Sequence, residues 1–315
     1  MSFFIIFFSL VFYNFSIFSN GYNDHAFITC QESNNLFVVD LEKAKVSKSF
    51  NLGTSPAAIF IDKIGGKVFV ANPNSDNVSI LDTKEDEVIE MDANKSPMGI
   101  TYDTKKSLIY VTNWYDDIIS VLSLAKKKIL TTIKVGKSPA GIAFNQNLNL
   151  LAVANRDSNS VTLINGDDYN DSKTIQTEKS PFGVFFGPDG NLLAVTNVQS
   201  NSVSILDLNT QKIIKNIKVG EWPYQVAFNK KAQKIFVTNQ REDSISIVNY
   251  NNFTHEEKIS DICGYPEGVD NSNDLNSIIV SCWFDNEIII MDLNTLKKKR
   301  ISVCEGPRSF GNFIF

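Results

Sequence analysis

Short apolar runs separated by short polar turns recur along the whole chain. In residues 234–249, the run KIFVTN is followed by a polar turn and then by a second apolar run, SISIVN. Six other segments repeat this pair, and in every copy the second run begins ten residues after the first. Nearly continuous apolar runs of this length, rich in Val and Ile, are typical of strands covered on both faces. Each pair therefore predicts a β-hairpin buried within a sheet.

A turn with a proline precedes every copy except the N-terminal one, and one more proline stands near the C-terminus. A fixed period near forty, built from short strands, is typical of a β-propeller with one sheet, or blade, per period. The sequence therefore predicts an all-β fold, a seven-bladed β-propeller with four-stranded antiparallel blades. The prolines recur at intervals of 41 to 43 residues: Pro56, Pro97, Pro139, Pro181, Pro223, Pro266 and Pro307.

The two ends of the repeat are incomplete and complement each other. Residues 25–40 contain a hairpin without a preceding inner strand, whereas residues 306–315 contain a proline turn and an inner strand without a hairpin. Unpaired strand edges are costly because they pair with other chains. We therefore expect the C-terminal strand to join the N-terminal hairpin, so that residues 304–315 and 25–50 share one blade. This closure predicts one domain over residues 22–315, and we expect a monomer.

The second position after each proline lies where seven inner strands converge on the propeller axis. We interpret the small residues found there as relief of steric crowding, with Gln225 as the exception. The residues at this position are Ala58, Gly99, Gly141, Gly183, Gln225, Gly268 and Ser309.

Residues 1–21 lie outside the repeat. The stretch FFIIFFSLVFYNFSIF is apolar, and Ser19 and Gly21 are small residues suited to a cleavage site before Tyr22. We interpret residues 1–21 as a signal peptide and expect an exported protein that is periplasmic, on the cell surface or secreted. An uncleaved membrane anchor is the alternative, although about 16 apolar residues are short for a span. No other stretch is apolar enough to cross a bilayer.

The VTN and VAN runs, together with turns of the form S-P-x-G-I-A-F, resemble the YVTN-type propeller repeat of surface-layer proteins and periplasmic propellers. The resemblance covers residues 25–315. Propellers of similar fold include the haem-bearing domain of dissimilatory nitrite reductases and the propeller lactonases. The resemblance therefore implies the fold and leaves the function open.

The four cysteines occupy only two positions of the repeat. Cys30 and Cys282 replace an Asn that ends the first run of the hairpin in the other blades. Cys263 and Cys304 lie three residues before a proline, and the blades that lose the Asn are those that gain this second Cys. The two positions are cross-strand neighbours, which predicts the disulfides Cys263–Cys282 and Cys30–Cys304 in an oxidising compartment. A metal site with four thiolates is the alternative, but the usual CxxC spacing is absent.

The turns within the hairpins and the proline turns emerge on one face, called here the top face, and they contain all three Trp residues. Aromatic rings with Arg around a funnel suit stacking and cation–π capture of an anionic, planar or peptide ligand. The alternative is that these rings only cover the ends of the sheets. The candidate ligand-binding residues are Trp114, Tyr115, Arg156, Phe182, Trp222, Tyr224, Arg241, Tyr265, Trp283, Phe284 and Arg308.

We expect a binding or scaffold protein that presents this aromatic and basic site to a ligand or protein partner. The alternatives are a propeller enzyme, either a lactonase-like hydrolase or a cofactor-bearing redox protein, and a protein that binds single-stranded nucleic acid. The net charge of −5 disfavours nucleic acid. Neither His25 nor His255 is placed over the axis, and the sequence predicts no catalytic residue, cofactor or metal site. Acidic residues in the same turns are expected to be solvated or bonded to backbone, and an acidic cluster that holds a metal is the alternative. These residues are Asp116, Asp117, Asp157, Asp243, Asp285 and Glu267.

Overall fold

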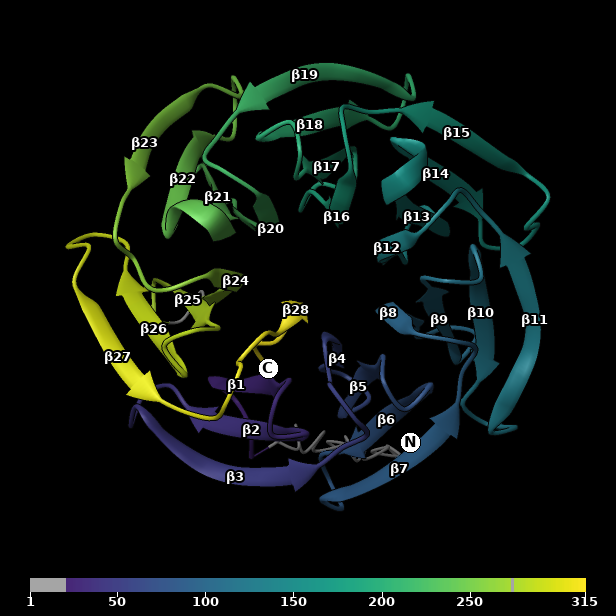
Figure 1. Ribbon diagram of the computed structural model, residues 1–315, viewed down its shortest axis with the longest axis horizontal. Coiled ribbons are helices and arrows are strands. Elements are labelled where there is room, and N and C mark those ends of the chain that lie inside the picture. Colours follow the sequence, from purple (N-terminus) through teal and green to yellow (C-terminus); the bar gives the residue numbers. More distant parts are fainter. Residues whose placement is uncertain (1–20, 273–274) are drawn as a thin grey trace, which may run out of the picture.

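The computed structural model describes residues 21–272 and 275–315, which form seven β-sheets arranged around a central axis (Figure 1). This confirms the predicted seven-bladed propeller of antiparallel blades. The predicted signal peptide lies almost entirely outside the described residues. Within the described part of the chain, no helix is long and apolar enough to cross a membrane.

The blades follow one another in chain order around the ring. Blade 1 contains β1 (His25–Cys30), β2 (Asn35–Asp40) and β3 (Lys45–Asn51). Blade 2 contains β4 (Ala58–Asp62), β5 (Lys67–Asn72), β6 (Asn77–Asp82) and β7 (Glu87–Asp92). Blade 3 contains β8 (Pro97–Asp103), β9 (Leu108–Asn113), β10 (Ile118–Ser123) and β11 (Lys128–Lys134). Blade 4 contains β12 (Pro139–Asn145), β13 (Leu150–Asn155), β14 (Ser160–Asn165) and β15 (Ser172–Gln176).

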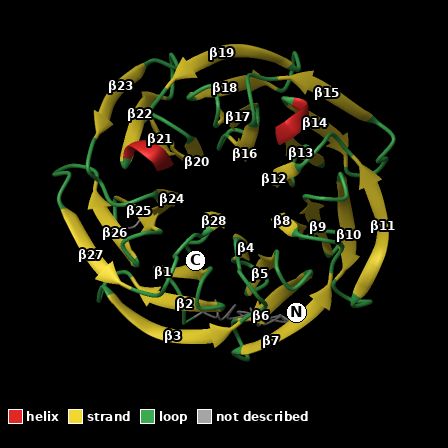
Figure 2. Cartoon of the chain, in the orientation of Figure 1, coloured by secondary structure: helices red, strands yellow, loops and turns green. Residues whose placement is uncertain are grey.

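The remaining blades repeat the same order. Blade 5 contains β16 (Pro181–Phe186), β17 (Leu192–Asn197), β18 (Ser202–Asp207) and β19 (Lys212–Lys218). Blade 6 contains β20 (Pro223–Asn229), β21 (Lys234–Asn239), β22 (Ser244–Asn249) and β23 (His255–Ile259). Blade 7 contains β24 (Pro266–Ser272), β25 (Ser277–Cys282), β26 (Glu287–Asp292) and β27 (Lys298–Ser302). The short strand β28 (Phe310–Gly311) follows, and the 3₁₀ helices η1 (Arg156–Ser158) and η2 (Gln240–Glu242) lie on the top face (Figure 2).

The two middle strands of each blade form the hairpins that the apolar runs predict. In blade 6, Lys234 pairs with Asn249 at one end of the hairpin and Asn239 pairs with Ser244 at the other. These strands are almost completely buried, because neighbouring blades cover both of their faces. The outermost strand of each blade is largely exposed and carries charged side chains, as the three Lys of β19 show, and these charges protect the open edge from pairing with other chains.

The ring is closed by residues 304–315, called here the closing segment. Its backbone bonds to β1, with Phe27 N donating to Phe313 O at 2.8 Å and Phe315 N donating to His25 O at 2.9 Å. The prediction that the two chain ends share blade 1 is therefore confirmed. One feature was not predicted: β28 also pairs, in parallel, with β4 of blade 2. Gly311 permits this contact because a Cβ there would lie 2.1 Å from Ile59 O.

Small residues are required at the inner strands, as the sequence predicts. A Cβ on Gly99 would lie 2.4 Å from Ala140 O in the next blade, and a Cβ on Gly141 would lie 2.6 Å from Phe182 O. At the exceptional position, the side-chain amide of Gln225 bonds to backbone near the axis. Its Nε2 donates to Gly311 O at 2.7 Å and its Oε1 accepts from Gly311 N at 3.0 Å. Gln225 therefore ties blade 6 to the closing segment.

Both predicted disulfides are present, Cys30–Cys304 and Cys263–Cys282, each with a Cα–Cα distance of 5.8 Å. The pairing uses all four thiols, so the four-thiolate metal site is excluded. Blade 4 shows what the disulfides replace. Asn155 Oδ1 accepts a hydrogen bond from Gly136 N at 3.0 Å, and the loop packs directly on this Asn. Where Cys occupies both positions, a covalent bond takes the place of this hydrogen bond.

Candidate functional site: an aromatic cavity on the top face

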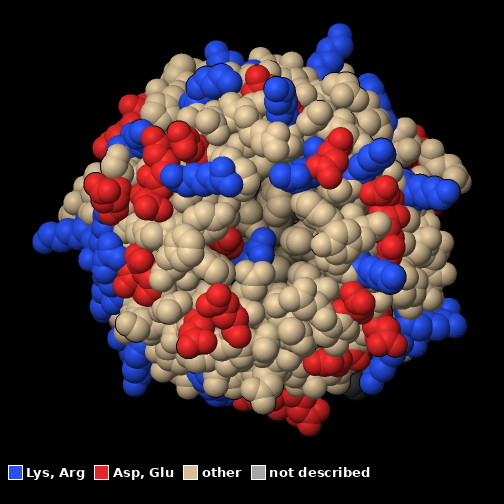
Figure 3. All heavy atoms as spheres, in the orientation of Figure 1, with Lys and Arg blue, Asp and Glu red and all other residues tan. Residues whose placement is uncertain are grey.

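The top face has a cavity of about 630 Å³ at the propeller axis. Figure 3 shows this face with a hollow at its centre, and basic and acidic atoms lie together at the bottom of the hollow. Six of the seven blades contribute side chains to it. The lining residues are Gln31, Trp114, Arg156, Phe182, Val198, Trp222, Tyr224, Gln240, Tyr265, Glu267, Trp283, Phe284 and Arg308.

Nine of the eleven candidate residues from the sequence line this one cavity. The two exceptions are Tyr115, which is 75% exposed, and Arg241. Arg241 lies directly behind the wall, because its guanidinium stacks on the Trp222 ring with 3.4 Å between the guanidinium carbon and the ring centroid. The structure thus brings the candidate residues together, and their role in ligand binding stays a prediction.

Six of the seven rings form two groups of contacting side chains. In the first group, Trp114 of blade 3 lies 6.2 Å from Phe182 of blade 5, and Phe182 stacks on Tyr224 of blade 6 at 4.7 Å, all measured between ring centroids. In the second group, all from blade 7, Trp283 packs edge-on against Phe284 at 4.9 Å, and Tyr265 contacts both rings. Phe284 remains 64% exposed. The wall is therefore made of rings whose free faces and edges border a shared space.

Two of these aromatic residues occupy strained backbone positions. The residue before the proline has a positive φ in each proline turn, and four blades place Ser there. Trp222 and Tyr265 adopt the same left-handed conformation, with φ of 53° and 56°. Bulky side chains rarely take this conformation, and it costs on the order of 1 kcal/mol. The turn itself therefore gives no reason for an aromatic residue at either position.

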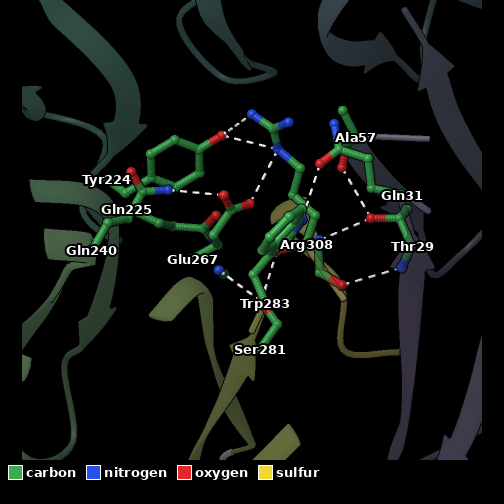
Figure 4. A network of polar contacts seen from close by, with 12 residues as sticks. Thr29, Gln31, Ala57, Tyr224, Gln225, Gln240, Glu267, Ser281, Trp283 and Arg308 are labelled. Carbon is green, nitrogen blue, oxygen red and sulfur yellow. Dashed lines mark hydrogen bonds and ion pairs between the residues drawn. The ribbon is translucent and has the colours of Figure 1, made fainter. Parts of the chain in front are cut away.

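A buried polar cluster forms the floor (Figure 4). Arg308 Nε donates to the Tyr224 hydroxyl at 3.0 Å, and Nη2 donates to the same oxygen. Glu267 Oε2 lies 3.1 Å from Arg308 Nε, as an ion pair without an aligned hydrogen bond. Glu267 Oε1 accepts a hydrogen bond from Gln240 Nε2 at 2.9 Å. The side chains of Arg308 and Glu267 are only 14% and 5% exposed, so the two charges face each other inside the protein.

The closing segment fixes Arg308 in place. Arg308 N donates to Thr29 O in β1 at 2.9 Å. Its carbonyl oxygen accepts from Ser281 Oγ in β25 at 2.7 Å and from Gly268 N in β24 at 3.1 Å. The backbone that carries the guanidinium is thus bonded to the blades on both sides.

Burial sets the charge state of this floor. Burial raises the pKa of Glu267 to about 7, although the Arg308 guanidinium acts to lower it. Burial also raises the pKa of Tyr224, which therefore stays a neutral hydrogen-bonding group at neutral pH. A carboxyl group with a pKa near 7 changes from the protonated to the ionised form within the physiological pH range.

The sequence prediction missed four of the lining residues: Gln31, Val198, Gln240 and Glu267. Glu267 was expected to be solvated or bonded to backbone, and this was wrong, because its carboxylate is buried against Arg308. The repeat register contains the signal that would have found them. Gln31, Val198 and Gln240 stand directly after the first strand of their hairpins. Trp114, Arg156 and Trp283 occupy the same position in other blades. Glu267 directly follows its proline, as Phe182, Tyr224 and Arg308 follow theirs.

The other acidic turn residues have local structural roles, as predicted. Asp243 Oδ1 accepts from Tyr265 N at 2.9 Å, and Asp285 Oδ2 accepts from Gly264 N at 2.8 Å. Across residues 21–272 and 275–315, no group of three or more His, Cys, Asp or Glu side chains is arranged to hold a metal ion.

A second cavity of about 350 Å³ lies on the axis below the first and is lined mainly by apolar side chains. Phe310 packs between the two cavities. Its ring contacts Phe182 and Tyr224 of the upper cavity and Phe185 of the lower one. Together with the bridge from Gln225 to Gly311, this ring separates the top-face cavity from the opposite face.

No protein-family model matches the sequence, and no curated protein matches it. The fold is similar to that of several solved structures. Hydrazine synthase of Kuenenia stuttgartiensis has a TM-score of 0.76 at 16% identity, with 87% of this chain and 93% of that chain covered. A functionally unknown protein from Desulfotomaculum acetoxidans has a TM-score of 0.75 at 14% identity, with 92% and 100% covered. Dihydro-heme d1 dehydrogenase NirN, in complex with DHE, has a TM-score of 0.69 at 14% identity, with 88% and 63% covered.

These likenesses place the chain in the class of seven-bladed β-propellers. Two of the three similar structures are named as enzymes and the third has no known function. At these identities the likeness extends to the fold alone, since propellers carry unrelated functions on one architecture.

Proposed function

We propose that this protein is a ligand-binding propeller that acts outside the cytoplasm and holds a flat organic molecule in its top-face cavity. The observation that carries the proposal is the convergence of seven aromatic rings, from four blades, on one space. A volume of about 630 Å³ lies within the range of about 300 to 1,000 Å³ usual for small-molecule sites. Rings of this kind bind planar molecules by stacking and edge contacts.

Two further features support binding over simple coverage of the sheet ends. Trp222 and Tyr265 occupy left-handed positions where four other blades place Ser, so an aromatic side chain is present there in spite of the backbone strain. Cations accompany the rings as well. The Arg156 guanidinium lies 5.7 Å from the Trp114 ring centroid, and the Arg308 guanidinium lies 5.7 Å from that of Tyr224.

Two disulfides are compatible with an exported protein, because such bonds persist in oxidising compartments. The proposed location rests on these bonds together with the apolar N-terminal stretch. The YVTN-type character of the repeat is part of the same proposal, since that repeat occurs in surface-layer and periplasmic propellers.

Intrinsic fluorescence tests the proposal directly, because all three Trp residues border the cavity. The probe is N-phenylnaphthylamine, a neutral pair of aromatic ring systems. We expect saturable quenching of Trp emission at one molecule per chain, with energy transfer to the probe. Trp114→Ala and Trp283→Ala should each weaken binding by about 1–3 kcal/mol per lost ring contact while circular dichroism stays unchanged.

Phe186→Ala is the matched control, since Phe186 lines the lower cavity. This variant should bind the probe as the wild-type chain does. Equal affinity in the wild-type chain and both Trp variants would leave the rings with a covering role only, and the proposal would then be wrong.

A further inference from the structure

We propose that the cavity binds organic anions, and that a bound anion replaces Glu267 as the counter-ion of Arg308, so that Glu267 takes up a proton on binding. The inference rests on the proposed function, which defines the cavity as a ligand site but leaves the charge of the ligand open. It deepens that function by naming the ligand class and the exchange that accompanies binding.

Arg308 has donors left for a ligand. A guanidinium carries five N–H donors. Within the described residues, Nε and Nη2 contact Tyr224 and Glu267, whereas Nη1 has no protein acceptor within hydrogen-bond distance. Figure 4 shows the end of the guanidinium directed away from Glu267. Since Arg308 lines the cavity, a carboxylate, sulfonate or phosphate that enters it can bond to this free end.

Glu267 is a poor permanent partner for Arg308. Its Oε2 approaches Nε at 3.1 Å without an aligned hydrogen bond, and it has no other hydrogen-bond donor in the described residues. A second anion on the same guanidinium would place two negative charges in a buried space. Like charges at such distances disfavour each other, and one of the two acids then binds a proton. Glu267 is the group that does so, because burial already holds its pKa near 7.

The groups around Glu267 do not offer it another countercharge. Arg308 comes from the closing segment, Tyr224 from β20 and Tyr265 from the turn before β24, and burial raises the pKa of both tyrosines. Arg241 in η2 is engaged in stacking on Trp222. The remaining neighbour from η2 is the neutral amide of Gln240.

The charge of the whole lining favours an anion. Its charged residues are Arg156, Arg308 and Glu267, which together give one net positive charge when Glu267 is ionised and two when it is protonated. Arg156 is paired at 2.8 Å with Asp157, which lies outside the lining, so the positive charge that Glu267 controls is that of Arg308. Protonation of Glu267 thus increases the attraction for an anion. A cation would instead need Glu267 ionised and would meet two arginines.

The direction of the pH dependence follows from this exchange. Anion affinity is highest below the pKa of Glu267 and falls as the pH rises through about 7, by up to about tenfold per pH unit. A cationic ligand held by Glu267 would show the opposite trend, and a neutral ligand would show none.

The experiment compares two probes that share their ring systems. Anilinonaphthalene sulfonate carries a sulfonate that stays ionised at all pH values used, whereas N-phenylnaphthylamine lacks it. Binding of each is measured by energy transfer from Trp between about pH 5.5 and about pH 8.5. We expect the Kd of the sulfonate to rise at least about tenfold across this range and the Kd of the neutral probe to stay constant.

Glu267→Gln removes the titrating group and keeps the acceptor for Gln240. This variant should bind the sulfonate with no pH dependence, and at about pH 8 it should bind at least about tenfold more tightly than the wild-type chain. Glu221→Gln is the matched control, since Glu221 is an exposed carboxylate beside Trp222, outside the cavity lining. It should retain the pH dependence of the wild-type chain.

Calorimetry of the wild-type chain provides a test that needs no variant. In buffers of different ionisation enthalpy at about pH 7.5, binding of the sulfonate should take up about three quarters of a proton per chain, because a group with a pKa near 7 is already about one quarter protonated at that pH. Binding of both probes with a Kd independent of pH, or a pH dependence that persists in Glu267→Gln, would overturn the inference and leave the proposed function standing. Binding of the neutral probe without binding of the sulfonate would also overturn the inference and leave the proposed function standing. If neither probe binds, both the proposed function and the inference are wrong.

Discussion

Replacing both cysteines of one disulfide with serine, in two separate double variants, measures how much stability the ring gains from joining its ends. The variants are Cys30→Ser/Cys304→Ser and Cys263→Ser/Cys282→Ser. The two bonds occupy equivalent positions, have the same Cα–Cα distance of 5.8 Å and are both buried. They differ in sequence separation, which is 274 residues for the first bond and 19 for the second.

The separation sets the expected magnitudes. A disulfide restricts the unfolded chain, and its contribution increases with the logarithm of the loop that it closes. This relation gives about 5.6 kcal/mol for the bond spanning 274 residues and about 3.2 kcal/mol for the bond spanning 19. The cost of placing two serines at buried positions is similar in the two variants and cancels in the comparison. The variant without the ring-closing bond should therefore be less stable by about 2.4 kcal/mol.

Equilibrium unfolding in guanidinium chloride, followed by Trp fluorescence and circular dichroism, measures this difference. Both signals should change together, and the midpoint should be lowest for Cys30→Ser/Cys304→Ser. Equal midpoints in the two variants would refute the reasoning, because local packing at the strand ends would then outweigh chain entropy. A lower midpoint for Cys263→Ser/Cys282→Ser would refute it as well.

Three further predictions address closure, the axial bridge and the buried acid. Deleting Arg308–Phe315 should lower the melting temperature and produce oligomers through the exposed edge of β1; a monomer with unchanged melting would contradict the closure. Gln225→Ala should cost about 1–3 kcal/mol in urea unfolding because Gly311 loses both amide partners, and an unchanged midpoint would contradict the bridge. The pKa of Glu267 is raised from 4.5 to about 7, so its protonation stabilises the fold below about pH 4.5, and this stabilisation is lost as the pH rises through about 7. Relative to the wild-type chain, Glu267→Gln should gain about 3 kcal/mol of stability between pH 4.5 and about pH 8, and parallel pH profiles of the two proteins would contradict the assignment.

The features predicted from sequence are those that repeat. Each hairpin is local, so its apolar runs specify it without reference to the rest of the chain. Seven copies in one register then determine the ring and its closure. The register also placed Cys30 opposite Cys304, although 274 residues separate them, because each stands at a known position of its blade.

The features that were missed depend on side-chain contacts between different blades near the axis. The amide of Gln225 bonds to Gly311 in the closing segment, a partner 86 residues away that no repeat position specifies. The burial of Glu267 depends on Arg308, at the equivalent position of the next repeat, and on the rings around both. In the other blades the residue directly after the proline includes Ala and Met, so the repeat fixes the place of this side chain but not its chemistry.

The same short segment closes the ring and forms the floor of the cavity. Cys304 carries the covalent link to β1, Arg308 lines the cavity, Phe310 separates it from the lower cavity, and Gly311 binds Gln225. Because Arg308 is held by hydrogen bonds from β1, β24 and β25, the guanidinium has its position only when the ring is closed. A ligand that binds Arg308 therefore binds the closed ring and not the open one. By mass action, such a ligand stabilises closure in proportion to its occupancy, which couples the affinity of the cavity to the stability of the whole propeller.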